Sequence, residues 1–108
     1  MQLLCFFDLP TQTRVDRRNY CRFRKFLLRL GFSMVEESVY GRMVINGNSM
    51  KSITDAIRAH RPPDGVVALL PVTEKQFANM EFIVGDTRTD VIHTKERVVE
   101  VSDFHRQD

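Results

Sequence analysis

The sequence lacks the features that would place it in a membrane class or in an easily recognised enzyme class. No apolar run approaches the roughly 18 residues that a membrane-spanning helix needs, so we expect no membrane span. The first eight residues hold neither a basic segment nor a small-residue cleavage site, and we expect no secretory signal. There is also no Walker loop, no Gly-x-Ser-x-Gly motif and no zinc-ligand spacing. The common motif-defined enzyme classes are therefore disfavoured.

Cysteine and histidine are scarce as well. The two cysteines, Cys5 and Cys21, stand in no Cys-x-x-Cys or Cys/His metal spacing, and we expect reduced core thiols of a cytoplasmic protein. The three histidines, His60, His93 and His105, are far apart in polar surroundings. This spacing predicts surface residues rather than a metal or catalytic set.

What the chain does have is the composition of one globular domain and an uneven distribution of charge. It contains 108 residues, 43% hydrophobic and 28% charged, with a net charge of +2. Residues 14–31 hold seven basic residues and one acidic residue, a net charge of +6, so the rest of the chain carries −4. Such a basic block indicates a nucleic acid or another polyanion as partner, although a solvated helix face has the same composition.

The first third of the chain predicts a strand followed by a helix. Residues 3–7 are apolar on both alternating faces, which is typical of a central strand covered on both sides, and Pro10 helps to end it. Thr13 and Asp16 predict a capping box, and the helix that follows runs to about Leu30 and stops at Gly31. Its apolar side consists of Tyr20, Phe23, Phe26, Leu27 and Leu30.

The remaining elements are shorter. Residues 32–39 and 40–45 are expected to be extended, with a bulge or bend at Gly41. After a turn at 46–48, a second helix capped by Asn48 or Ser49 carries an apolar face of Met50, Ile53 and Ile57. A strand at 66–73, in which Pro71 indicates a bulge or an edge, is followed by a turn at 74–79, a fifth strand at Met80–Val84 and a further possible strand at Arg97–Val101.

This order predicts an α+β fold, a ferredoxin-like βαββαβ sandwich with an additional C-terminal strand. We expect a single domain with the ferredoxin-like part at 1–86 and a tail at 87–108. Right-handed crossovers would place both helices on one sheet face, yet the first strand is apolar on both faces. A second copy is the simplest cover for the other face, so the sequence predicts a sheet-to-sheet homodimer.

Asp8 is the first candidate functional residue, because it ends the central strand where open sheets often bring ligands. It is either a metal-binding carboxylate or an ordinary turn residue. Asp8 shares parity with Leu4 and Phe6. If that face is the dimer interface, two copies of Asp8 could meet and repel unless a cation or proton intervenes, and a shared Mg²⁺ would suit them.

The second candidate is a basic stripe on the first helix, with steps of three and four residues. Its members are Arg14, Arg18, Arg22, Lys25 and Arg29. Neighbouring cations at this spacing repel one another, and a phosphate backbone would relieve the repulsion. The alternative is a solubilising face. The RNA-recognition version of this fold is disfavoured, because residues 41–45 offer no aromatic side chain for base stacking.

Five short stretches of the sequence are distinctive in combination: Phe6-Phe7-Asp8-Leu9-Pro10, Phe23-Arg24-Lys25-Phe26-Leu27, Gly31-Phe32, Glu37-Ser38-Val39-Tyr40 and Val72-Thr73-Glu74-Lys75-Gln76-Phe77. Together they resemble a known family, the small CRISPR-associated protein two of spacer acquisition. The block Met80-Glu81-Phe82-Ile83-Val84-Gly85 is similar to members that accompany a large single-protein effector nuclease, as in type II systems. The resemblance covers residues 1 to about 86.

The resemblance implies a cytoplasmic ferredoxin-like homodimer that binds duplex DNA and bridges two dimers of the CRISPR spacer integrase in antiviral defence. It implies that Asp8 is the ligand of a divalent cation, Mg²⁺ or a similar ion, shared at the dimer interface. It also maps Arg14, Arg17 and Arg18 onto the nucleic-acid path, beside Arg22 and Lys25 of the stripe.

The resemblance leaves a second function open, a magnesium-dependent endonuclease that hydrolyses RNA or duplex DNA with Asp8 as its catalytic residue. Each chain would supply one carboxylate and no visible general base, which are few catalytic groups for phosphodiester hydrolysis. We rank the scaffold role first for that reason. A free ribonuclease toxin of the same fold is a third, more distant reading.

Overall fold

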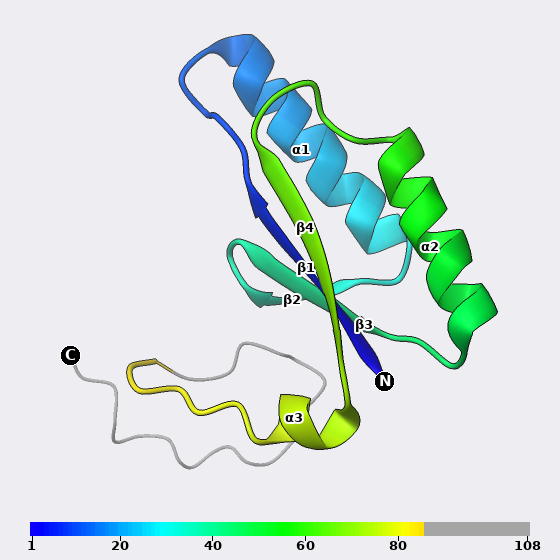
Figure 1. Ribbon diagram of the computed structural model, residues 1–108. Helices are drawn as coiled ribbons and strands as arrows, with labels where there is room; N and C mark the ends of the chain where they lie inside the picture. The colour runs from blue at the N-terminus through cyan, green and yellow to red at the C-terminus, as the bar shows by residue number, and fades with distance from the viewer. Residues whose placement is uncertain (86–108) are drawn as a thin grey trace.

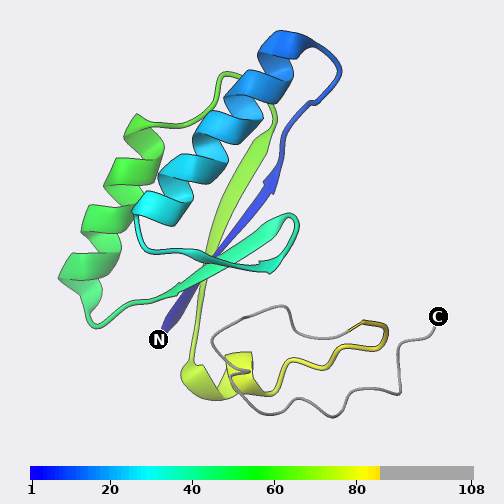
Figure 2. The same ribbon diagram turned by 180° about the vertical axis from the view of Figure 1, so that it is seen from behind.

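The structure, a computed structural model, describes residues 1–85. Its elements in chain order are β1 (Gln2–Asp8), α1 (Arg14–Arg29), β2 (Ser33–Glu36), β3 (Val39–Met43), α2 (Gly47–Ala59), β4 (Val66–Val72) and α3 (Glu74–Ala78). The strands form one antiparallel sheet in the order β2-β3-β1-β4, and α1 and α2 lie side by side on one side of it (Figures 1 and 2). The predicted α+β, ferredoxin-like arrangement is confirmed.

The boundaries of α1 follow from the local sequence as predicted. The Thr13 hydroxyl accepts a hydrogen bond from the Asp16 backbone N–H at 3.0 Å, and the Asp16 carboxylate accepts one from the Thr13 N–H at 3.1 Å. This capping box satisfies two backbone donors that the first turn would otherwise leave free. At the other end Gly31 has a φ of +98°, the left-handed conformation that glycine adopts readily after a helix.

The core lies between β1 and the two helices. Leu3, Cys5 and Phe7 face the helices and are buried, together with Phe23 and Leu27 of α1. All five residues of the apolar side predicted for α1 therefore belong to the core. Phe23 and Leu27 are fully buried, and Tyr20, Phe26 and Leu30 are partly buried.

Aromatic side chains fill the centre of this core. The Phe7 ring lies 5.5 Å from that of Phe23 and 5.4 Å from that of Tyr40, measured between ring centroids. Tyr40 is only 1% exposed, and its hydroxyl accepts a hydrogen bond from Arg24 Nε at 2.8 Å. The polar end of a buried tyrosine is thereby satisfied, which avoids the cost of an unpaired buried hydroxyl.

The two thiols differ, which corrects one expectation. Cys5 is buried, and desolvation raises its pKa to about 12, whereas Cys21 is exposed. The prediction of a core thiol is wrong for Cys21, because two residues along a helix is roughly half a turn, which points Cys21 away from buried Phe23.

We therefore expect one of the two cysteines to react with a thiol reagent in the folded protein at neutral pH, and both after unfolding. A raised pKa lowers the thiolate fraction of Cys5, and burial denies the reagent access. Titration with a chromogenic disulfide measures the count. In Cys21→Ser the folded protein should show no fast thiol, and a fast thiol in that variant would contradict the burial of Cys5.

The position of the bulge in the sheet differs from the sequence prediction. Gly41 is regularly paired with Leu4 and Ser33, and the sheet irregularity lies instead between Met34 and Glu36. Glycine leaves room at position 41, since a Cβ there would lie 3.1 Å from Leu4 Cδ2, and the Leu4 side chain would have to shift by a few tenths of an ångström.

The start of α2 and the segment after β4 differ as well. Asn46 caps α2, accepting from the Ser49 N–H at 2.9 Å, so the helix begins before both of the expected caps, Asn48 and Ser49. The expected turn after β4 is the short helix α3, capped by Thr73. Pro71 does lie on an edge strand of the described sheet, as predicted.

The predicted fifth strand at Met80–Val84 is wrong for the part of the chain that the structure describes, where these residues form no strand. A strand needs a neighbouring edge to pair with, and α3 turns the chain away from β4 (Figure 1). The possible strand Arg97–Val101 and the tail at 87–108 lie outside the described residues. Among residues 1–85, no helix has the length and apolar character needed to cross a membrane.

Candidate carboxylate site and nucleic-acid interface

Asp8 is the last residue of β1, directly opposite Val66 of β4. Alternation along the strand puts its exposed side chain on the face that Leu4 and Phe6 share, away from the helices. The parity that the sequence predicted is confirmed. Asp8 is therefore free to contact a ligand that approaches the sheet from the uncovered side.

Gly65 lets the chain before β4 pass close to the backbone of Asp8 and Leu9, a role that the sequence analysis missed. Its φ is +93°, and a Cβ at this position would lie 2.5 Å from the Asp8 carbonyl oxygen and 2.8 Å from Leu9 Cδ2. Only glycine fits so close to the backbone. The available signal was the Pro-Asp-Gly turn at 63–65, directly before the strand that pairs with β1.

Gly65→Ala is expected to lower the free energy of unfolding by about 2 kcal/mol or more. Alanine adopts the positive φ at a cost, and its Cβ would clash with the Asp8 carbonyl oxygen. Urea denaturation measures the change. Gly47→Ala is the matched control, since a Cβ at Gly47, the first residue of α2, meets nothing within 4 Å. Equal free energies of unfolding for the two variants would show that the backbone at position 65 has room for a side chain beside Asp8.

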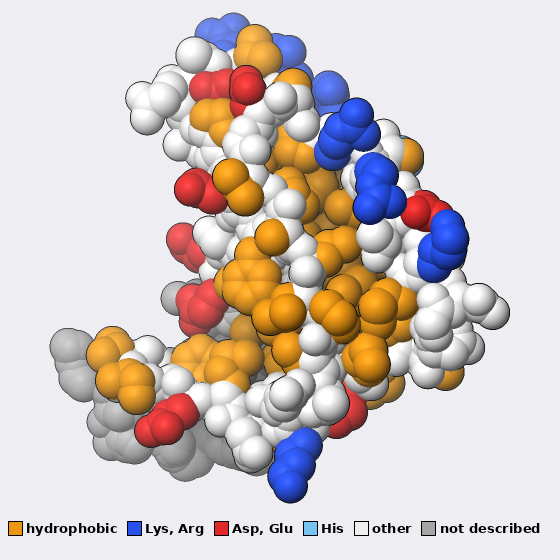
Figure 3. Space-filling model, viewed as in Figure 1, with side chains coloured by type: hydrophobic (Ala, Val, Ile, Leu, Met, Phe, Trp, Pro, Cys, Tyr) orange, Lys and Arg blue, Asp and Glu red, His pale blue; other side chains and the backbone are white. Residues whose placement is uncertain are grey.

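The sheet face around Asp8 is apolar and open to solvent in the single chain. We define this open sheet face by four exposed residues, Phe6 (37% exposed), Leu70 (49%), Met43 (60%) and Val66 (62%). Figure 3 shows hydrophobic side chains gathered over β4, the edge strand that carries Val66 and Leu70. Apolar residues clustered on a sheet face are typical of a surface that another molecule covers.

As a metal ligand, Asp8 offers one hard oxygen donor group. Residues 1–85 contain no group of three or more His, Cys, Asp or Glu side chains placed to hold an ion. Magnesium is commonly held by one or two carboxylates with water completing its shell. Asp8 fits such a site as one of two carboxylates, and a second copy of the chain would supply the other.

The basic stripe (Arg14, Arg18, Arg22, Lys25 and Arg29) lies on α1, and all five side chains are exposed. None of the ion pairs formed within residues 1–85 involves it. Arg17 differs from its neighbours, because its guanidinium donates to the carbonyl oxygens of Thr11 and Gln12, each at 3.2 Å. The structure thus gives Arg17 a contact that holds the loop between β1 and α1.

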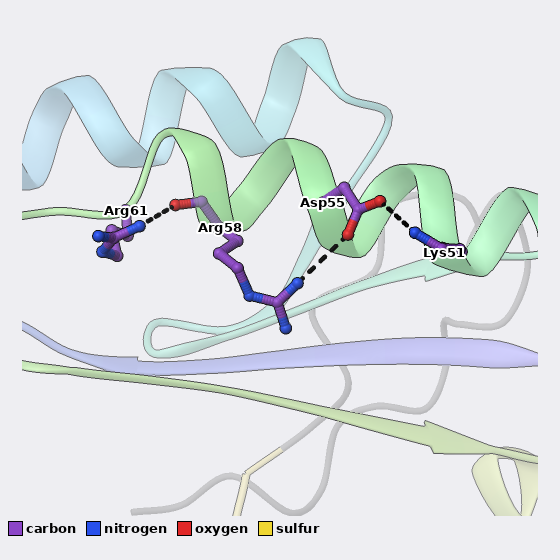
Figure 4. Close-up of polar contacts among 4 residues, drawn as sticks. All are labelled: Lys51, Asp55, Arg58 and Arg61. Atoms are coloured by element: carbon purple, nitrogen blue, oxygen red, sulfur yellow. Dashed lines mark hydrogen bonds and ion pairs between the residues drawn. The ribbon is translucent and has the colours of Figure 1, made fainter.

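The cations of α2 are arranged differently, as Figure 4 shows. Asp55 accepts from Lys51 Nζ at 2.8 Å and from Arg58 Nη1 at 3.2 Å, and the hydrogen bond from Lys51 is the main cause that lowers the pKa of Asp55. Arg61 Nη1 donates to the Arg58 carbonyl oxygen at 2.8 Å. Two cations of α2 are therefore partly neutralised, whereas the α1 stripe has no ion-pair partner in the part of the chain that the structure describes.

A cavity of about 420 Å³ lies between α2 and β4, and the sequence analysis did not predict it. Its apolar wall includes Ile57, Val67 and Leu69, and Arg58 and Arg61 also line it. Val67 and Leu69 pair with Phe7 and Cys5, which puts the cavity on the helix side of the sheet. Asp8 is on the other face, so the cavity does not serve the carboxylate site.

The structure does not bring the two candidate sites onto one face. Asp8 lies on the open sheet face, whereas α1 with its stripe covers the opposite face (Figures 1 and 2). They approach each other at one end of the molecule, where the loop after β1 leads into the first turn of α1. One chain thus presents an acidic position and a basic surface on opposite sides of its sheet.

Comparison with known proteins agrees with the resemblance seen in the sequence. The family model described as CRISPR associated protein Cas2 matches residues 1–80. The chain is 46% identical over 99 residues to a protein named CRISPR-associated endoribonuclease Cas2 from Treponema denticola, a match that covers 92% of this chain and 98% of the relative. Proteins of the same name from Lacticaseibacillus rhamnosus (41%, covering 92% and 98%) and Acidovorax ebreus (45%, covering 79% and 83%) are also similar.

Proposed function

The chain belongs to the CRISPR associated protein Cas2 family, and on that premise we propose that it is a homodimeric, duplex-DNA-binding subunit of spacer acquisition. In this role it bridges dimers of the spacer integrase in CRISPR antiviral defence. The integrase carries the strand-transfer chemistry, and this subunit holds the DNA.

The basic stripe is the observation that carries the proposal. Five exposed cations stand in a line on α1, and none of them is engaged by an ion pair within residues 1–85. Bringing them together costs a few tenths of a kcal/mol for each neighbouring pair. Phosphates would relieve this repulsion and release counterions, which makes a nucleic-acid backbone the best-matched partner.

The open sheet face supports the homodimer. Four large apolar side chains are exposed on it, and α1 and α2 cannot cover it because both lie on the other side. A second copy offers an identical apolar face, as a two-fold dimer requires. In such a dimer Asp8 of each chain lies at the rim of the shared face.

Endoribonuclease activity is the second candidate, favoured by the printed names of the relatives. A magnesium ion held by Asp8 and the partner's Asp8 would activate water and stabilise charge on the phosphodiester. Asp8 would hold and orient the ion, and the nearby arginines of α1 would bind the flanking phosphates. This role ranks second because each chain contributes a single carboxylate.

Binding to duplex DNA is expected to be sequence-tolerant and steeply dependent on salt. Each neutralised phosphate contributes about −0.9 to the slope of log affinity against log salt concentration. Replacing both Arg14 and Arg18 by alanine should flatten the slope by roughly one to two units per protomer, measured by fluorescence anisotropy.

Lys51→Ala is the matched control for the stripe, because Lys51 is a cation already paired with Asp55. The slope of log affinity against log salt concentration should be the same for Lys51→Ala as for the unmodified chain. If the Arg14 and Arg18 variant keeps both affinity and slope, the stripe is a solvated face and the proposal fails. Co-purification with the integrase tests the bridging role separately.

A further inference from the structure

A second basic surface lies where the C-terminal end of α2 packs beside α1. Here a groove of about 260 Å³ is lined by Arg22, Phe26 and Arg29 of α1 and by His60 and Arg61 at the end of α2. Within residues 1–85, no acidic side chain lines this groove. The groove lies on the helix layer and is therefore separate from the open sheet face and from Asp8.

The groove contains an aromatic platform. The rings of Phe26 and His60 are stacked, with centroids 4.3 Å apart and planes 19° from parallel. His60 Nδ1 donates to the Ala56 carbonyl oxygen at 3.0 Å, which fixes the orientation of the imidazole. Because Phe26 covers one face of this exposed ring, the opposite face is available for a further planar group.

Three guanidinium groups accompany this platform. Arg22 and Arg29 lie two turns apart on α1, and Arg61 directly follows His60. Arg61 is held in place by its hydrogen bond to the Arg58 carbonyl at 2.8 Å and keeps other N–H donors for a ligand. None of the three takes part in an ion pair within residues 1–85.

We propose that this α1–α2 groove binds one or two nucleotides of a single-stranded nucleic acid, with a base stacked on His60 and its phosphates held by the three arginines. Aromatic side chains combined with a cationic groove are what single-strand binding requires. A duplex is a poorer match, because its bases are already stacked on one another and cannot reach a side-chain ring.

This inference rests on the proposed nucleic-acid function and deepens it. The exposed stripe offers charge alone, which suits a duplex backbone, and the groove adds a site for an unpaired end or overhang. The strand would pass from the stripe into the groove at Arg22 and Arg29, the two residues that belong to both.

The test compares a fluorescein-labelled oligothymidylate with a labelled duplex, using fluorescence anisotropy on the full chain. His60→Ala should weaken oligothymidylate binding by roughly tenfold through the loss of one base stack, and should leave duplex binding unchanged. His60→Trp keeps a planar ring and should restore binding. Replacing both Arg29 and Arg61 by alanine should flatten the single-strand salt slope by about 1.4 units.

Several outcomes would overturn the proposal. Oligothymidylate binding that His60→Ala leaves unchanged, in a variant with a normal melting curve, would place the single strand elsewhere while duplex binding by the stripe still stood. Equal competition by polyglutamate and by oligothymidylate would show that the groove recognises charge and not bases. Binding of neither probe would contradict both this inference and the proposed function.

Discussion

Replacing Asp8 by asparagine is expected to reduce divalent-cation-dependent cleavage of RNA or DNA to background while leaving the fold and the dimer intact. The amide keeps the shape of the side chain but is a poor magnesium ligand. The fold should survive because Asp8 is exposed at the end of β1. Without metal the dimer should be at least as stable, since two carboxylates at the interface no longer repel each other.

Spacer integration by the reconstituted complex should persist in Asp8→Asn, because the integrase carries the strand transfer. Cleavage and integration should be measured on the same preparation. Asp64→Asn is the matched control, as it removes an exposed carboxylate from the neighbouring loop and should retain cleavage. Loss of integration by an intact, DNA-bound complex would make Asp8 catalytic for the main function. Cleavage that survives would indicate another metal site or a contaminating nuclease.

The second large effect concerns the oligomeric state. The chain should sediment at micromolar concentration with about twice its mass of 12.6 kDa. Placing aspartate at both Phe6 and Leu70 should give a folded monomer. Both residues are exposed in the single chain, so an aspartate there would be buried without a partner only in the dimer. The substitutions should therefore destabilise the dimer and leave the core of each chain intact.

Val15→Asp provides the control for this double variant. Val15 is 54% exposed but lies on α1, away from the open sheet face, so the same change of residue type should leave the dimer intact. A stable monomer of the unmodified chain with a cooperative melt would contradict the sheet-to-sheet dimer. The shared carboxylate site would then lose its second ligand as well.

Features decided by neighbouring residues could be predicted from the sequence. The capping box of Thr13 and Asp16 and the helix stop at Gly31 depend on a few adjacent residues, and both are present as expected. The face on which Asp8 lies follows from strand alternation alone. The one-sided placement of the helices follows from the handedness of the crossovers.

Features decided by distant parts of the chain could not be predicted. The role of Gly65 depends on its approach to Asp8, and the use of Gly41 depends on the packing of Leu4. His60 was assigned to the surface correctly, yet its stacking on Phe26 arises only because α1 and α2 lie side by side. Met80–Val84 has a strand-like composition, but composition does not supply the sheet edge that a strand needs.

The central position of β1 has a consequence for how the chain folds as it is synthesised. Although β1 is made first, its two neighbours are β3 and β4, and Gln2 pairs with Val72. The sheet therefore cannot close until residue 72 has left the ribosome, and until then one edge of an apolar strand stays unpaired. Such non-local pairing slows folding, because distant segments must meet before contacts offset the lost chain entropy. Newly made chains at high local concentration would be most vulnerable to aggregation during this interval.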